Sequence, residues 1–244
     1  MRLDKLLSAA AIATRSESAR AVRQGLVSVN GIAVRRADVQ VDPMRDTVLF
    51  RGEAVVYKPF RYVMLNKPDG YVSATEDGRD PTVLELLSPA LAAQGLFPCG
   101  RLDKHTLGLM LLTNNGELSH RLLSPRRHVA KTYAFSAKFP LSDADCAQFR
   151  QGLVLEDGYE TKPAEIALNP DRRSGTITLI EGKYHQIKRM LEALHNQITA
   201  LERITFGPLA LPGNLSRGAW RELTAEEELA LFAAAELDPA TQIK

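Results

Sequence analysis

The chain has 244 residues, of which 45% are hydrophobic and 25% are charged, and its formal net charge is +2 at pH 7. These are the proportions of an ordinary globular protein, and the length allows one large domain with a small second one. Because the sequence lacks a run of about eighteen apolar residues, it predicts no membrane span. The charged N-terminus does not have the pattern of a signal peptide, and the only cysteines are Cys99 and Cys146, so a reduced cytoplasmic protein is expected.

The charge is unevenly distributed along the chain. Residues 1–60 contain ten Lys or Arg and six Asp or Glu, which gives this segment a net charge of +4, whereas the remainder has a net charge of −2. A small basic segment beside a near-neutral body is typical of a nucleic-acid-binding module joined to a second function.

The first part of the chain has the pattern of two helices. Leucines at helical spacing predict a helix over residues 2–8. A second helix is expected over residues 16–24, with Ser16 as its N-cap and Gly25 as the residue that stops it.

Short strands should follow these helices. Asn30-Gly31 is a strong hairpin signal within residues 26–34, and a further strand is expected near 47–50. The segments RLDKLL, TRSESAR and GLVSVNGIAV, in this order, resemble the S4 RNA-binding domain. The resemblance implies that residues 1–57 form a small α/β domain whose helices lay a basic face on structured RNA. The RNA contacts expected on this face are Arg2, Lys5, Arg15, Arg20 and Arg23.

The rest of the chain mixes strand and helix patterns after an expected linker at residues 51–60. A turn is expected at residues 66–70. Strands are expected over residues 62–65, 71–73, 109–113, 129–137, 153–155, 176–180 and 201–206. Helices are expected over residues 82–87, 117–123, 142–151, 187–194 and 224–236. This pattern predicts an α+β domain over residues 58–237 and a flexible tail at 238–244.

One carboxylate stands out in the basic stretch from Pro98 to Phe135. Asp103 is followed by many Lys, Arg and His residues, and Glu117 is the only other acid in the stretch. Neighbouring cations would hold Asp103 ionised as a nucleophile or base, and the same cations suit a polyanionic substrate. A glycosidase acting on free sugars is disfavoured because a second carboxylate close in sequence is missing.

The sequence contains no motif that would bind a metal or a cofactor. The histidines lack metal-ligand spacing, and neither a Walker loop nor a GxGxxG motif is present, so no metal and no cofactor are expected. One carboxylate, one tyrosine and several cations could carry out nucleophilic catalysis on a sugar or base carbon without a cofactor.

A second resemblance covers residues 61–210. The segments VMLNKPDGY, GRLDKHTLGL with LLTN, KTY and EGKYHQIKRM resemble, in order, the motifs of the RsuA branch of pseudouridine synthases. The resemblance implies a mainly antiparallel catalytic sheet with flanking helices, and conversion of a specific uridine in RNA to pseudouridine. It implies that Asp103 is the nucleophile, that Tyr133 stacks on the flipped base and that Lys188 pairs with Asp103. Arg101 would flip or contact the substrate. Attack on the ribose C1′ and a glycal-type intermediate both remain open.

The substrate is expected to be 16S ribosomal RNA, because the segment from Ser119 to Tyr133 most resembles the small-subunit enzymes. It would be bound either as naked RNA or in a partly assembled small subunit, and the protein would act as a monomer. The further RNA contacts expected in the catalytic part are Asn66, Lys67, His105, Thr106, Arg126, Arg127, His128, Lys131, Gln186 and Arg189. Two alternatives are a synthase acting on 23S RNA and a non-catalytic RNA-binding or ribosome assembly protein. The intact trio of Asp103, Tyr133 and Lys188 argues against the second.

Overall fold

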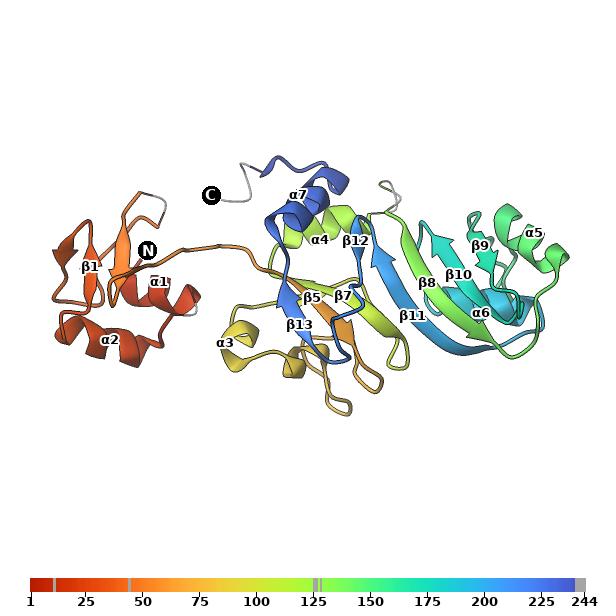
Figure 1. Cartoon of the computed structure of the whole chain (residues 1–244), viewed down its shortest axis with the longest axis horizontal. Coiled ribbons are helices and arrows are strands. Elements are labelled where there is room, and N and C mark those ends of the chain that lie inside the picture. The colour runs from red at the N-terminus through yellow and green to blue at the C-terminus, as the bar shows by residue number, and fades with distance from the viewer. Residues whose placement is uncertain (11, 44, 125–126, 128, 240–244) are drawn as a thin grey trace.

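A computed structural model describes residues 1–10, 12–43, 45–124, 127 and 129–239. The chain forms two parts, and Figure 1 shows a small N-terminal part joined by an extended segment to a larger one. None of the helices within these described ranges is long and apolar enough to cross a membrane.

The N-terminal part packs two helices against a small sheet. Its elements are α1 (Leu3–Ala9), α2 (Arg15–Arg23), β1 (Val27–Val29), β2 (Ile32–Ala33), β3 (Val48–Phe50) and β4 (Glu53–Ala54). The strands pair antiparallel in the order β2-β1-β3-β4. Leu3, Leu6 and Leu7 of α1 are fully buried against the sheet and α2. The predicted hairpin is present, with Asn30 and Gly31 at positive φ in its turn.

Two expectations for this part were wrong. The second helix is capped by Thr14 and not by Ser16, because the Thr14 side chain accepts a hydrogen bond from the Glu17 N–H while Glu17 bonds back to the Thr14 N–H. The predicted linker contains strand β4, which pairs with β3 across a turn at Arg51 and Gly52.

The larger part is built on one twisted, mixed sheet (Figure 1). Its strands are β5 (Tyr62–Lys67), β6 (Phe97–Cys99), β7 (Leu107–Thr113), β8 (Lys131–Ala137), β9 (Glu165–Leu168), β10 (Ser174–Leu179), β11 (Ile198–Phe206), β12 (Leu209–Ala210) and β13 (Trp220–Glu222). Its helices are the 3₁₀ helix η1 (Val83–Leu86), α3 (Pro89–Ala92), α4 (Gly116–Leu123), α5 (Asp143–Gln151), α6 (Gln186–Ala193) and α7 (Ala225–Ala234). The strand order is β13-β5-β7-β11-β8-β10-β9, with β6 beside β7 and β12 beside β11.

Strands β7 and β11 join the two halves of this sheet as a parallel pair, whereas the other pairings are antiparallel. The join is short and close. Gly108 has φ +98°, and a Cβ at this position would lie 2.3 Å from the Arg203 carbonyl oxygen. Only glycine therefore allows β7 to approach β11 here. The loop that carries Asp103 lies directly before β7, so this join sets its position.

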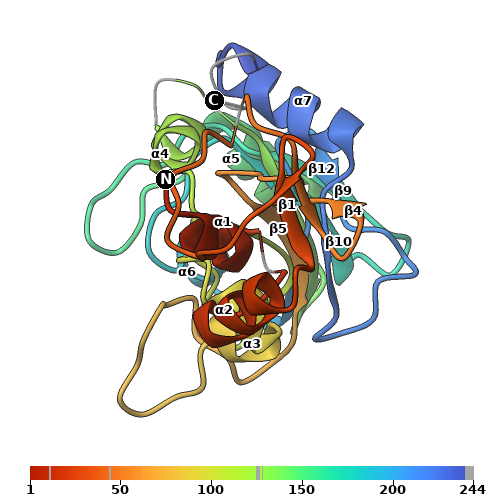
Figure 2. The ribbon, with the colours of Figure 1, turned by 90° about the vertical axis from the view of Figure 1, so that its left-hand side faces the viewer.

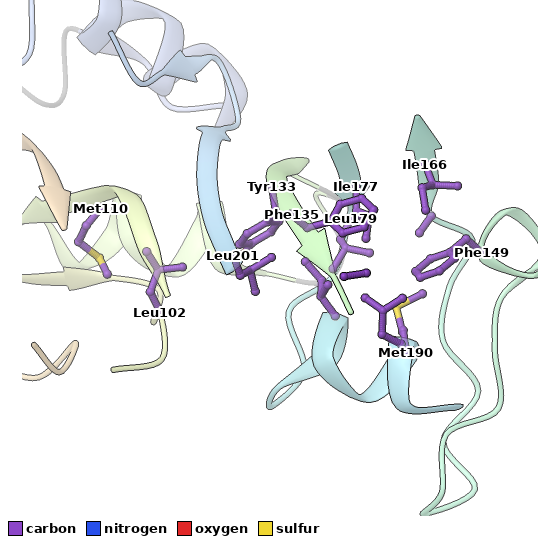
Figure 3. Close-up of a cluster of buried hydrophobic side chains, with 14 of the residues drawn as sticks. Leu102, Met110, Tyr133, Phe135, Phe149, Ile166, Ile177, Leu179, Met190 and Leu201 are labelled. Atoms are coloured by element: carbon purple, nitrogen blue, oxygen red, sulfur yellow. The ribbon is translucent and has the colours of Figure 1, made fainter. Parts of the chain in front are cut away.

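Helices cover both faces of the sheet. On one face, α3, α5 and α6 pack against β7, β8 and β10. Figure 3 shows members of this cluster, among them Tyr133, Phe135 and Leu201 of the sheet, Met190 of α6 and Phe149 of α5. On the other face, α4 and α7 pack against β5 and β7. Strand β5 is buried along its whole length as a result, and the central strands form a rigid base for the loops at their ends.

Several local predictions for the larger part need correction. Asn66 and Lys67, which were expected in a turn, end strand β5. Residues 71–73 and 153–155 were expected as strands but contribute only the isolated bridges Val72–Thr82 and Val154–Glu160. Strands β6, β9, β12 and β13 were missed, since they are short and lack a strong alternation. The helix expected over residues 82–87 is the 3₁₀ helix η1, and the Ser88 side chain caps the next helix, α3.

The two parts touch beside the extended segment. Figure 2 views the molecule from the N-terminal end, with α1 and α2 toward the reader. Gln94, which follows α3, donates a hydrogen bond of 3.3 Å to the Ser8 carbonyl of α1. Lys5, Arg15 and Lys58 line a cleft between the parts.

Candidate active site

Asp103 lies in the loop before β7 and is held by cationic and polar neighbours. The Lys188 Nζ is 2.7 Å from Asp103 Oδ2, and the His185 Nε2 is 3.4 Å from Oδ1. The Thr106 hydroxyl lies 3.5 Å from Oδ2, and the Thr106 N–H donates to the Asp103 carbonyl. The Asp103 side chain is 28% exposed, so the carboxylate is oriented by its partners and still open to a substrate.

Helix α6 supplies two of these partners because of the way its sequence is buried. Ile187, Met190 and Leu191 face the core, which leaves Lys188 on the side that meets Asp103. His185 directly precedes the helix in the left-handed conformation, with φ 50° and ψ 30°. A non-glycine residue in this conformation costs on the order of 1 kcal/mol. This conformation places the His185 ring against the Asp103 carboxylate.

Tyr133 comes from strand β8, whose residues alternate between buried and half-buried. The alternation places Lys131, Tyr133 and Phe135 on one face of the sheet. Tyr133 borders the core beside Leu201 (Figure 3) and also lines a cleft of about 800 Å³ that contains Asp103. The structure therefore brings Asp103, Tyr133 and Lys188 from three separate segments to one place.

Lys67 was expected to contact RNA, but its side chain is 0% exposed. Its ammonium donates hydrogen bonds to the carbonyl oxygens of Pro68, Lys104 and Thr106, at 3.2, 2.9 and 2.9 Å. Burial lowers the pKa of Lys67 to about 8, although the charges of Asp69 and Asp103 oppose this shift. Because two of the three carbonyls belong to the Asp103 loop, Lys67 supports that loop from beneath.

Three other expected RNA contacts are also buried and have structural partners. Asn66 donates to the Leu215 carbonyl at 2.7 Å and accepts from Arg217 at 2.6 Å. Gln186 is bonded to the Glu181 carboxylate and the Lys183 N–H. Thr106 is almost fully buried beneath Asp103. These side chains shape the site and do not present a surface to RNA.

The rim of the cleft carries the exposed groups. Arg101 is exposed and lines the cleft next to Asp103. His105 is exposed but is not among the residues that line the cleft, and it lies 2.9 Å from the Asp69 carboxylate, whose pKa it helps to lower. Arg189 points elsewhere, to an ion pair of 2.5 Å with Asp157.

The segment after α4 contains three of the expected RNA contacts, and the structure describes only Arg127 among them. Arg127 forms an ion pair of 2.5 Å with Glu236. Together they line a separate cavity between α4 and the C-terminal helix. Arg126 and His128 lie outside the described residues.

The basic residues of the N-terminal part are exposed. Arg2 pairs with Asp4 at 2.7 Å. Lys5, Arg15, Arg20 and Arg23 are exposed on α1 and α2, and none of them lies within 4 Å of a carboxylate in the described part of the chain.

The floor of the cleft holds two buried cations, Lys131 and Arg203. Lys131 was expected as an RNA contact, but it is buried at the base of the cleft. Arg203 was missed altogether, although a charged residue inside the apolar strand pattern of 201–206 was a usable signal. No cluster of three or more His, Cys, Asp or Glu that could hold a metal ion occurs among the described residues.

Comparisons with known proteins agree with this geometry. Residues 61–193 match the family model described as RNA pseudouridylate synthase, and residues 1–46 match that of the S4 domain. The chain is 42% identical to the ribosomal small subunit pseudouridine synthase A of Yersinia pestis and 38% identical to that of Escherichia coli. These alignments cover 93% of this chain and 96% and 98% of the relatives.

Two further known proteins also align with nearly the whole chain. An uncharacterised RNA pseudouridine synthase of Bacillus subtilis is 44% identical, over 93% of this chain and 96% of its own length. A crystal structure of a pseudouridylate synthase has 36% identity and a TM-score of 0.68, over 95% of this chain and 99% of that one. Both resemblances seen in the sequence are thus confirmed, and the chain belongs to the RNA pseudouridylate synthase family, with an S4 domain at its N-terminus.

Proposed function

We propose that this pseudouridine synthase isomerises one specific uridine of small-subunit (16S) ribosomal RNA. The observation that carries the proposal is the Asp103 carboxylate, which Lys188 holds at 2.7 Å in a cleft shared with Tyr133. The relatives named as small-subunit enzymes, aligned over nearly the whole chain, support the choice of RNA.

In the proposed reaction Asp103 is the nucleophile, and Lys188 and His185 orient its two oxygens. Tyr133 stacks against the extruded base. The target carbon is inaccessible while the nucleotide is stacked, so the nucleotide must flip out of the RNA. Arg101, exposed at the rim next to Asp103, is placed to fill the gap or to hold the flipped nucleotide.

RNA binding is assigned to the basic N-terminal part. Lys5, Arg15, Arg20 and Arg23 provide exposed positive charge, and phosphate contacts of this kind supply affinity without sequence preference. The uridine would then be selected in the cleft of the catalytic part. The protein is proposed to act as a monomer in the cytoplasm, where ribosomal RNA is modified.

The test combines a gene-deletion strain with the purified protein. Pseudouridine is mapped in the 16S and 23S RNA of the deletion strain, and the missing site is restored with wild-type protein and with Asp103→Asn. Loss of one 16S site, restored by wild type alone, is the expected result. Loss of a 23S site would favour the large-subunit alternative. Full restoration by Asp103→Asn would refute the nucleophile and favour a non-catalytic assembly role.

The substrate form is tested with the same protein. Purified 16S RNA and partly assembled small subunits are incubated with enzyme at equal RNA concentration. A faster initial rate on one of them identifies the form in which the uridine is presented.

A further inference from the structure

Two cations are buried at the floor of the cleft without a carboxylate partner. Arg203 is 1% exposed and Lys131 is 8% exposed, and both line the cleft that contains Asp103. Throughout the described ranges, neither lies within 4 Å of an acidic side chain. A buried cation without a counter-charge is costly, so its retention calls for a reason beyond packing.

Local contacts fix these two side chains but leave their charges uncompensated. The Arg203 Nε donates to the Leu109 carbonyl at 2.7 Å, and its guanidinium lies 5.1 Å from the centre of the Phe206 ring. The Lys131 Nζ donates to the Val129 carbonyl at 2.8 Å. Burial and the positive charge of Arg203 lower the pKa of Lys131 to about 8. The pair therefore forms a preorganised positive site that is buried at the base of the cleft.

The site lies beside the place assigned to the uracil base. Arg203 is the direct cross-strand partner of Tyr133, and side chains in such pairs are about 5 Å apart at Cβ. Lys131 is on the same face of β8 as Tyr133, at the next inward-facing position. A base stacked on Tyr133 would thus have both cations at its edge.

The reaction itself creates an anion at this point. When the N1–C1′ bond breaks, its electron pair stays with the base, in the route through an Asp103 ester and in the route through a glycal alike. The detached ring carries one negative charge, shared by N1 and the two carbonyl oxygens. It keeps this charge until C5 bonds to C1′. On the ester route this attack breaks the bond between C1′ and the Asp103 oxygen and frees the carboxylate. On the glycal route Asp103 takes the C2′ proton during the elimination and returns it to C2′ when C5 bonds to C1′. The C5 proton is then released and N1 takes up one proton, so no proton is gained or lost overall. Atoms and electrons balance without a co-reactant.

We propose that Lys131 and Arg203 form an anion site that stabilises the detached uracil ring while it turns from N1 to C5. The proposal rests on the proposed function. The buried position of Lys131 and Arg203 favours the uracil ring over a phosphate as their ligand. An RNA backbone that approaches the cleft meets the exposed cations Arg101 and Lys183 first. Only an extruded base would reach the buried floor.

The test compares two leaving groups in wild type, Lys131→Met and Lys131→Arg. Single-turnover rates are measured at saturating enzyme on 16S RNA with either uridine or 5-fluorouridine at the target. Rearranged nucleosides are quantified by chromatography and mass spectrometry. Fluorine withdraws electrons and stabilises the ring anion by itself, so the enzyme has less to contribute. Lys138→Met is the matched control, since Lys138 is an exposed lysine directly after the same strand.

Lys131→Met is expected to lower the saturated rate on uridine about 100-fold, as loss of one preorganised donor typically does. On 5-fluorouridine the loss should be about 10-fold or less, and the RNA dissociation constant should change less than about 2-fold. Lys131→Arg, which keeps the charge, should recover a substantial part of the rate.

Equal losses on both substrates would overturn the proposal. So would weaker RNA binding with an unchanged saturated rate, which would identify a phosphate contact. Circular dichroism checks that Lys131→Met is folded; if it is not, Arg203→Lys, which moves the charge, is subjected to the same comparison. An inactive wild type on 16S RNA would refute the proposed function itself, and this result is distinct from each of the others.

Discussion

Lys67→Met tests whether a buried ammonium holds the catalytic loop. Methionine keeps the length and apolar character of the side chain but removes three hydrogen bonds, to the carbonyls of Pro68, Lys104 and Thr106. Loss of each hydrogen bond from the charged ammonium costs about 1 kcal/mol or more, although the Lys104 carbonyl keeps one donor, the Gly70 N–H. Removal of the buried charge returns part of this cost. We therefore expect the free energy of unfolding to fall by about 2–3 kcal/mol.

The effect should be visible in both stability and catalysis. In a chain of this size about 2–3 kcal/mol lowers the melting temperature by about 4–12 °C, which thermal unfolding monitored by circular dichroism would detect. Because the loop from Lys104 to Thr106 adjoins Asp103, its loosening should also lower the saturated turnover rate, on the order of 100-fold for a displacement of about 1 Å. RNA affinity should be unaffected, since the side chain is buried.

Lys138→Met, at an exposed lysine, is the control and should leave both quantities unchanged. An unchanged melting temperature and rate in Lys67→Met would show that the three hydrogen bonds contribute nothing net. Weaker RNA binding at a normal saturated rate would instead indicate that Lys67 contacts RNA, and it would refute the supporting role inferred from its burial.

Further predictions concern the N-terminal part, the sheet join and pH. Arg20→Ala and Arg23→Ala should each reduce the slope of log affinity against log salt by about 0.7–0.9 at an unchanged saturated rate, and unaltered slopes would argue against phosphate contacts on α2. Gly108→Ala should lower the free energy of unfolding, measured in urea, by about 3 kcal/mol or more. The control Gly78→Ala should not, because the space around Gly78 is open, and equal stability of the two variants would contradict the close strand contact. Burial lowers the folded-state pKa of Lys67 and Lys131 to about 8 from the ordinary 10.5. Between these values the unfolded chain binds more protons, so stability from these groups rises with pH by up to about 1.4 kcal/mol per unit per group. Urea unfolding at about pH 7.5 and 9.5 should show a smaller rise in Lys131→Met than in wild type.

The sequence by itself was sufficient for the family and for the chemical groups of the site. Motif order identified the S4 domain and the pseudouridine synthase, because the Asp103, Tyr133 and Lys188 segments each carry local signatures. Helices with strong caps and one apolar face were predicted well, as at Thr224, where the capping box opens α7. These features depend on neighbours in the chain, which a sequence displays directly.

The tertiary structure decided which polar residues face the substrate and which support the fold. Asn66, Lys67 and Gln186 lie in motifs that looked like RNA contacts, yet helices and loops from distant segments cover them. The positions of Arg203 and His185 also depend on tertiary structure. Arg203 lies where β11 pairs with β7, and His185 adopts a left-handed backbone conformation directly before α6. Burial and long-range pairing depend on how separate segments pack together, and motif spacing does not contain that information.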